Sequence, residues 1–148
     1  MSRAEMAILT NMCMIQNEKG QILIQDRLKH NWPGVTFPGG HIEKGESFHD
    51  SVIREVFEET GLTIRNPKLC GVKQFQTANE ERYIVFFYRA KEFEGELASS
   101  AEGEVSWIEP EDLANYTLAN DFEDMYRVFA DDSISEFFYD ADWKVALM

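Results

Sequence analysis

The sequence has few cysteines, few basic residues and no long hydrophobic run, and each shortage excludes a class of protein. Cys13 and Cys70 stand far apart among 148 residues, without His or Cys at metal-ligand spacing, so neither a disulfide scaffold nor a zinc motif is indicated. Lys and Arg number 14 against 27 Asp and Glu, a formal net charge of -13, which argues against binding a long polyanion or an anionic membrane by charge alone. No stretch reaches transmembrane length. We therefore expect a cytoplasmic protein with reduced thiols.

What the sequence does contain is typical of an ordinary globular domain. Of its 148 residues, 44% are hydrophobic and 13% aromatic, enough for a substantial core, and neither repeats nor low-complexity tracts are visible. We expect residues 1–148 to form a single domain. The apolar run from Met6 to Ile15 is broken by Thr10 and Asn11, so we interpret it as a strand rather than a signal peptide.

Strand patterns occupy much of the chain on both sides of one central helix. Ala7 to Ile15 and Gln21 to Arg27 flank the turn-rich tetrad 17–20 and predict a β-hairpin. Val35 to Phe37 predicts a short strand, and Leu69 to Gln76 a longer one. The run from Arg82 to Phe93 is nearly continuous in apolar and aromatic residues, which predicts a strand buried on both faces in the middle of the sheet.

The last third of the chain predicts a strand, two helices and a terminal hairpin. Val105 to Ile108 is the strand, and Pro110 suits the first position of a short helix over Glu111 to Ala114. A second helix begins near Asn120 or Asp121, because apolar residues then recur at i, i+3, i+4 and i+7. The apolar stripe of this helix consists of Phe122, Met125, Tyr126 and Phe129. The strands of the terminal hairpin are Ser135 to Tyr139 and Trp143 to Leu147.

The stretch from Gly40 to Leu62 predicts a glycine-rich loop followed by the central helix. Ser47 is a suitable N-cap, Asp50 three residues later completes an acidic variant of the capping box, and Gly61 stands where a helix C-cap is expected. At about 100° per residue, one flank of this helix is apolar. That flank contains Phe48, Val52, Ile53 and Val56.

The same helix carries a crowded group of carboxylates at Glu55, Glu58 and Glu59, with Arg54 beside them. Like charges at i,i+3 and i,i+4 repel one another, so something positive should lie among them. A divalent cation is the simplest candidate, because all-oxygen sites suit Mg²⁺ first and Mn²⁺ or Ca²⁺ next. The alternative is a solvated acidic helix face.

The spacing of these residues resembles the Nudix box, the signature of the Nudix hydrolases. Gly40 is followed after five residues by Glu46 and after seven more by the segment from Arg54 to Leu62, and every fixed position of the motif is filled. The resemblance implies a Nudix fold of the α/β (α+β) class, in which a mixed β-sheet is sandwiched between helices (α/β/α). The predicted C-terminal hairpin is an addition similar to one in some 8-oxo-purine nucleotide hydrolases of the family.

The resemblance also implies an activity, the Mg²⁺-dependent hydrolysis of a nucleoside diphosphate linked to another group. Mg²⁺, with Mn²⁺ as a substitute, would be held by Glu55, Glu58, Glu59, the Gly40 carbonyl and a further glutamate ahead of the Trp107 strand. Glu102 matches that further ligand best, and Glu104 is the reserve candidate. Glu55 or Glu59 would take the proton from water, and we favour Glu55 with Arg54 orienting it.

The pattern of the whole chain is most similar to the MutT-type 8-oxo-dGTP diphosphatases, which release the monophosphate and pyrophosphate. In that branch an arginine at the position of Arg27 contacts the substrate phosphates, and an asparagine near Asn120 reads the base. Phe37, His41 and Phe75 complete the expected substrate-binding set. Two residues depart from the pattern. His41 stands where MutT-like boxes often have lysine, and Thr36 stands where a related enzyme has a base-contacting asparagine.

Several positions have a second interpretation. Arg27 alone is a surface charge, Phe75 a core aromatic, Asn120 a helix cap, and Trp32, in the loop from His30 to Gly34, either closes a cavity or covers the edge of the core. Other nucleoside triphosphates or dinucleoside polyphosphates are alternative substrates. A non-catalytic nucleotide sensor and a calcium-binding module are alternative classes. In each case the partner is a small nucleotide or ion rather than long nucleic acid or membrane, and monomer and homodimer stay open.

Overall fold

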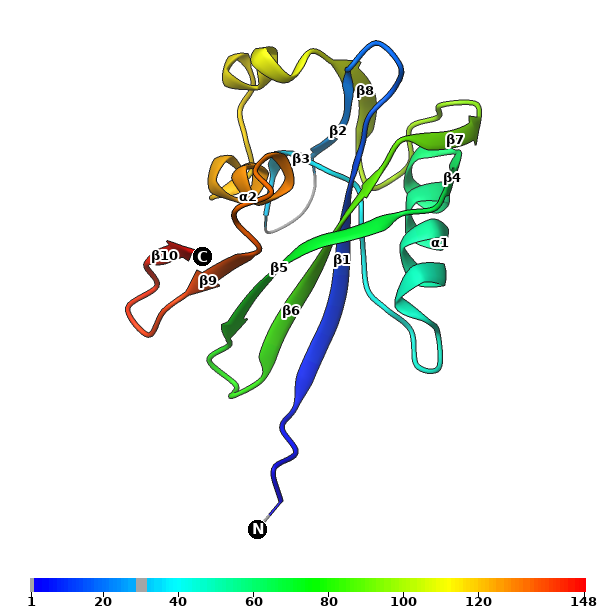
Figure 1. The fold of residues 1–148 in the computed structure, drawn as a ribbon. Coiled ribbons are helices and arrows are strands. Elements are labelled where there is room, and N and C mark those ends of the chain that lie inside the picture. The colour runs from blue at the N-terminus through cyan, green and yellow to red at the C-terminus, as the bar shows by residue number, and fades with distance from the viewer. Residues whose placement is uncertain (1, 29–31) are drawn as a thin grey trace.

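The computed structural model describes residues 2–28 and 32–148, and within them a mixed five-stranded sheet forms the centre of the fold (Figure 1). Strands β1 and β6 pair in parallel, β6 and β5 are antiparallel, β5 and β9 are parallel, and β9 and β10 are antiparallel. In spatial order the strands are β1 (Ala7–Ile15), β6 (Arg82–Ala90), β5 (Lys68–Gln76), β9 (Glu136–Tyr139) and β10 (Val145–Leu147). His30 and Asn31 of the predicted loop lie outside the described residues.

Two smaller sheets flank the main one in the described part of the chain. The first joins β3 (Gly34–Thr36), β2 (Ile22–Arg27) and β8 (Glu104–Ile108), with β2 in the middle. The second joins β4 (Leu62–Arg65) to β7 (Glu92–Gly95).

The helices cover opposite faces of the main sheet. Figure 1 shows α1 (Phe48–Thr60) on one side of β1 and β6 and α2 (Phe122–Ala130) on the other. Val52 and Val56 of α1 belong to one buried hydrophobic cluster, and Phe122 and Phe129 of α2 belong to another. The predicted class, a mixed sheet between helix layers, is confirmed.

The caps of α1 are formed by the predicted residues. Ser47 accepts a hydrogen bond from the Asp50 amide at 2.9 Å, and Gly61 adopts a left-handed conformation with φ of 79° while its N–H donates to the Phe57 carbonyl. Strand β6 lies inside the main sheet, as its apolar sequence predicts. The terminal hairpin is also confirmed, and β9 extends the main sheet by pairing with β5.

The predicted hairpin of Ala7–Ile15 with Gln21–Arg27 is wrong, although its turn forms. The Asn17 amide donates to the Gln21 carbonyl at 3.0 Å, and Gln16 and Ile22 make one bridge. Beyond that bridge β1 pairs with β6 and β2 pairs with β3 and β8. Both strands are buried on both faces over most of their length, so they diverge into different sheets instead of sharing a ladder.

The predicted strand from Arg82 to Phe93 is interrupted at Lys91, and its end becomes β7. Its partner β4 was missed, because four residues directly after a helix cap show too short an alternation to separate strand from loop. The predicted helix at Glu111–Ala114 is a 3₁₀ helix, η1 (Pro110–Asn115). Strand β3 ends at Thr36, one residue before the predicted end, and the N-cap of α2 is Asp121.

No helix of residues 2–28 and 32–148 combines the length and apolar character needed to cross a membrane.

Replacing Gly61 with alanine should destabilise the fold more than the same change at Gly45. Both glycines have φ of 79°, but only at Gly61 would a Cβ overlap a backbone oxygen, that of Glu96. We expect Gly45→Ala to lower the free energy of unfolding by about 1 kcal/mol, the cost of the left-handed conformation, and Gly61→Ala by about twice that or more. Urea denaturation measures both. Equal losses would contradict the steric argument.

Candidate active site

One cavity of about 1030 Å³ collects nearly all of the predicted site residues. It opens between the glycine-rich loop, the carboxylate face of α1 and the ends of β2, β5 and β6. All predicted site residues except Arg54 line it, namely Arg27, Phe37, Gly40, His41, Glu55, Glu58, Glu59, Phe75, Glu102 and Asn120.

The glycine-rich loop runs along β1 as if it were a further strand. The Cys13 amide donates to the Pro38 carbonyl, and the Asn11 amide donates to the Gly40 carbonyl, each at 2.9 Å. A Cβ on Gly39 would overlap the Asn11 carbonyl, and one on Gly40 would overlap the Glu55 carboxylate. Both glycines are therefore needed because the loop passes in contact with β1 on one side and α1 on the other.

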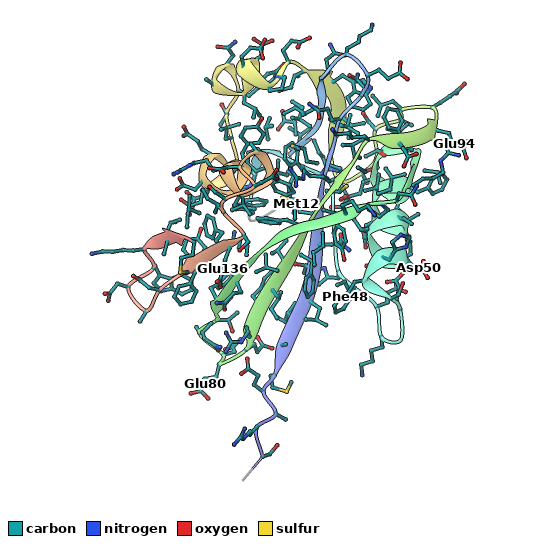
Figure 2. The ribbon with its side chains drawn as sticks, viewed as in Figure 1. Met12, Phe48, Asp50, Glu80, Glu94 and Glu136 are labelled. Atoms are coloured by element: carbon teal, nitrogen blue, oxygen red, sulfur yellow. The ribbon has the colours of Figure 1, made fainter. Side chains whose placement is uncertain are left out.

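The Asn11 side chain joins the three segments. It is 3% exposed, and its Nδ2 donates to Ser51 Oγ on α1 at 2.9 Å, while its Oδ1 accepts from the Gly40 amide at 3.1 Å. Figure 2 shows the neighbouring Met12 near the middle of the molecule, and Met12 is buried like Asn11. Asn11 therefore sets the position of the loop relative to the helix.

Arg54 is the positive group among the box carboxylates. Its Nε and Nη2 contact the two oxygens of Glu46 at 2.6 and 2.9 Å, and its Nη1 contacts Glu55 at 2.9 Å and Glu58 at 3.2 Å. These contacts raise the pKa of Arg54, and they hold the pKa of Glu46 at about 2. Glu46 thus supports Arg54, and Arg54 supplies part of the positive charge that the crowded helix requires.

Glu59 and Glu55 are partly removed from water. Glu59 is 4% exposed, and its carboxylate accepts the Gly39 amide at 2.8 Å. Burial raises the pKa of Glu59 to about 7, against the Gly39 hydrogen bond, which lowers it, and the Glu55 charge raises it further. Burial also raises the pKa of Glu55, in spite of its Arg54 contact. Simultaneous ionisation of Glu55 and Glu59 is therefore unfavourable unless a cation binds between them.

The donor set suits a hard divalent cation. Glu55, Glu58, Glu59 and Glu102 all bring oxygen atoms to the same cavity, and oxygen ligands are those that Mg²⁺ and Mn²⁺ prefer. Within the described residues, no three carboxylate, imidazole or thiol groups are already gathered closely enough to hold an ion. Arg54 and the Gly39 amide hold three of these carboxylates, those of Glu55, Glu58 and Glu59, so a bound cation would compete for oxygens that have partners. The Gly40 carbonyl accepts the Asn11 amide and keeps a second lone pair.

Arg27 and Trp32 form another part of the cavity wall. The Arg27 guanidinium carbon lies 5.7 Å from the centre of the Trp32 ring, and its buried Nε has no hydrogen-bond partner in the described part of the chain. Trp32 packs against the edge of the core, lines the cavity and donates from Nε1 to the Asn120 backbone carbonyl at 3.1 Å. Asn120 itself is exposed and leaves its side-chain amide at the cavity.

The remaining predicted residues differ in how far they reach the cavity. Phe37 is 2% exposed and packs edge-to-face on Phe122 and Phe129, so most of its ring belongs to the core. His41 is exposed, and its carbonyl accepts from Arg54 Nη2 at 3.0 Å. Glu102 lies close enough for its charge to raise the pKa of Glu59.

Two residues named in the sequence analysis, Glu104 and Thr36, do not line the cavity. The reserve candidate Glu104 lies exposed in β8, opposite Asp26. Thr36 is fully buried, with its Oγ1 3.9 Å from Met12 Sδ, so the hydroxyl belongs to the core.

Other residues of the cavity were missed by the sequence analysis. Lys73, Tyr83 and Tyr139 line it, and Asn11 positions its loop. The sequence could have indicated Lys73. Its side chain lies on the same face of β5 as Gly71 and Phe75, and a single lysine on an otherwise uncharged strand face suggests a specific contact. Tyr83 and Tyr139 have no such signal, since either fits a core strand.

Comparison with known proteins places these features in a family. The NUDIX domain model matches residues 8–131. The chain is 35% identical over 112 residues to the uncharacterized Nudix hydrolase YvcI of Bacillus subtilis (strain 168), covering 72% of this chain and 69% of that protein. It is 33% identical over 99 residues to an 8-oxo-dGTP diphosphatase of Haemophilus influenzae, covering 65% of this chain and 71% of the other. The crystal structure of a mutator MutT protein from Bacillus halodurans superposes with a TM-score of 0.74 at 26% identity, over 93% and 94% of the two chains.

Replacing Asn11 with alanine should loosen the loop as well as the fold. The change leaves the part-buried Gly40 amide without its acceptor and removes a donor from the buried Ser51 hydroxyl, so we expect the free energy of unfolding to fall by about 2–4 kcal/mol. Ser51→Ala removes the bond to Asn11 and a bond to Glu46 but leaves the Gly40 bond in place, and it should cost about 1 kcal/mol. Urea denaturation gives both values, with exposed Asn79→Ala as a control near zero. An Asn11→Ala loss of about 1 kcal/mol or less would contradict a role for the Gly40 bond.

Proposed function

The chain belongs to the NUDIX family as a MutT-like hydrolase of nucleotide phosphoanhydrides, and from that premise we propose that it cleaves a purine nucleoside triphosphate. The substrate is 8-oxo-dGTP or a related purine deoxynucleotide, and the products are the monophosphate and pyrophosphate. The observation that carries the proposal is the content of the cavity. Carboxylates of α1 and the aromatic rings of Trp32, Phe75 and Tyr83 share one space of about 1030 Å³, large enough for a nucleotide.

The reaction is the attack of water on a phosphorus atom of the triphosphate. A new P–O bond forms to the water oxygen, one P–O–P bond breaks, and pyrophosphate leaves. Glu55 accepts the proton of the attacking water, because its carboxylate lines the cavity, whereas that of Glu59 is nearly covered and is hydrogen-bonded to Gly39. Arg54 holds one oxygen of Glu55 and so orients the other. A divalent cation, Mg²⁺ or in its place Mn²⁺, would be bound by Glu55, Glu58, Glu59 and Glu102 and would supply positive charge against the phosphates.

Arg27 and Asn120 bind the two ends of the substrate in this proposal. Arg27 has a buried N–H to which no described residue is hydrogen-bonded, and a guanidinium fork matches phosphate oxygens. The Asn120 amide offers a donor and an acceptor together, as reading a guanine-like edge requires. Trp32 contacts both residues: its Nε1 donates to the Asn120 backbone carbonyl, and the Arg27 guanidinium lies over its ring.

The organisation of the chain fits this assignment. We propose that residues 1–148 form one domain, because β9 and β10 complete the same sheet that carries β1. A cytoplasmic location stays a prediction that rests on the free Cys13 and Cys70. Monomer and homodimer also stay open.

Glu58→Gln should keep the fold and lower turnover by about 100-fold or more. The change removes one ligand charge without altering side-chain volume, and Glu58 is exposed apart from its Arg54 contact. Pyrophosphate release at millimolar Mg²⁺ measures the effect. Asp50→Asn is the matched control, because it removes one charge from the same helix at a position that Figure 2 shows away from the sheet. Near-normal turnover of Glu58→Gln would overturn the metal assignment.

A panel of nucleotides decides the substrate. We expect kcat/KM for 8-oxo-dGTP or another purine deoxynucleoside triphosphate to exceed that for pyrimidine triphosphates and dinucleoside polyphosphates, with pyrophosphate rather than phosphate as the second product. Activity confined to dinucleoside polyphosphates would reject the proposal. Nucleotide binding without Mg²⁺-dependent hydrolysis would identify a sensor instead.

A further inference from the structure

Lys73, in the middle of β5, is a buried lysine in the wall of the cavity. It is 8% exposed, and its Nζ lies among aromatic rings contributed by separate parts of the chain. The distances from Nζ to the ring centres are 5.1 Å for Phe137, 5.2 Å for Tyr139, 5.4 Å for Trp32 and 5.8 Å for Phe75.

The ammonium group has more hydrogen-bond donors than residues 2–28 and 32–148 satisfy. Among the described residues, the one acceptor found within hydrogen-bond distance of Nζ is Met125 Sδ at 3.6 Å, and a thioether is a weak acceptor. The nearby carboxylate of Asp121 favours the charged form of Lys73, but it is also the acceptor for the Tyr139 hydroxyl. Burial lowers the pKa of Lys73 to about 8, so most of the lysine is still a cation at neutral pH.

Packing alone does not account for this lysine. Each cation–π contact attracts the ammonium group, yet a ring face is a poorer partner for its N–H groups than an oxygen acceptor. A methionine would fill the same space among Trp32, Phe137 and Tyr139 without the desolvation of a charge. A buried cation with spare donors beside an open cavity is suited to a ligand that brings an acceptor.

The position of Lys73 within the cavity indicates which part of a nucleotide it meets. Trp32, over which its Nζ lies, is hydrogen-bonded to the Asn120 carbonyl, and Phe75 lies two residues further on the same face of β5. Flat rings and an amide are the groups that bind a purine. The carboxylates for the phosphates come instead from α1.

We propose that Lys73 is a specificity-determining residue that donates a hydrogen bond to the oxygen of a 6-oxo-purine and thereby selects such bases against 6-amino-purines. This inference rests on the proposed function, since it assumes that the cavity takes a purine nucleotide. A lysine has three donors and no acceptor. The guanine-type edge offers O6 and N7 as acceptors, whereas adenine presents an amino group at position 6 that would face the ammonium as a second donor.

The wild-type protein gives the first test. Hypoxanthine and adenine differ at position 6 and in the N1 proton that accompanies it, so dIMP and dAMP are compared by calorimetry, and dITP and dATP by kcat/KM. We expect the 6-oxo nucleotide to be preferred about 10-fold or more in both measurements. Equal binding of dIMP and dAMP, including no binding of either, or a preference for dAMP, overturns the inference. This test does not depend on the folding of any variant.

Lys73→Met gives the second test, with Lys68→Met as its matched control, since Lys68 is exposed on the same strand. We expect the preference for dITP over dATP to fall to within about 3-fold in Lys73→Met, mainly by loss of dITP turnover, and to stay unchanged in Lys68→Met. The melting temperature of Lys73→Met should not fall, because the change removes a buried charge. An unchanged preference in folded Lys73→Met overturns the inference.

The two proposals fail in different ways. Purine triphosphate hydrolysis with no 6-oxo preference leaves the proposed function intact and rejects the role of Lys73. Absence of triphosphate hydrolysis rejects the proposed function, while the dIMP and dAMP affinities still decide whether Lys73 selects the base.

Discussion

The site depends on the close approach of a glycine loop to a strand on one side and to a helix on the other. Asn11 hydrogen-bonds both Gly40 and Ser51, so one buried amide sets the distance between β1, the loop and α1. Neither glycine of the loop leaves room for a Cβ, because one touches β1 and the other the Glu55 carboxylate. The carboxylates of α1 can face the cavity only while this junction holds.

The charge on α1 is balanced within the protein only in part. Arg54 contacts Glu46, Glu55 and Glu58 and so relieves the repulsion that the sequence leads one to expect. Glu59 is turned away from Arg54 toward the Gly39 amide, and burial leaves its pKa near 7. The helix thus retains a carboxylate pair, Glu55 and Glu59, whose full ionisation a cation would favour.

Buried polar groups without sufficient partners also occur among the aromatic rings of the cavity. Within the part of the chain that the structure describes, Lys73 is a buried cation without a strong acceptor, just as Glu59 is a buried acid beside another acid. Among the same residues, the buried Nε of Arg27 also has no partner. In each case a polar or charged group at the cavity wall lacks full compensation. Such a group lowers the stability of the ligand-free fold, and it can bind a ligand group of complementary charge or hydrogen-bonding type.

The sequence by itself determined the central helix, its caps and the grouping of acidic side chains on that helix, because these depend on residues close together in the chain. Ser47, Gly61 and the spacing from Gly40 to Glu59 need no distant partner to be recognised. Strand pairing needs distant partners, which is why β1 and β2 separate into different sheets after a correctly predicted turn, and why β4 was missed. Only the tertiary structure brought Lys73 among rings from two other segments, since whether a lysine in a strand faces water or a cavity is decided by what packs over it.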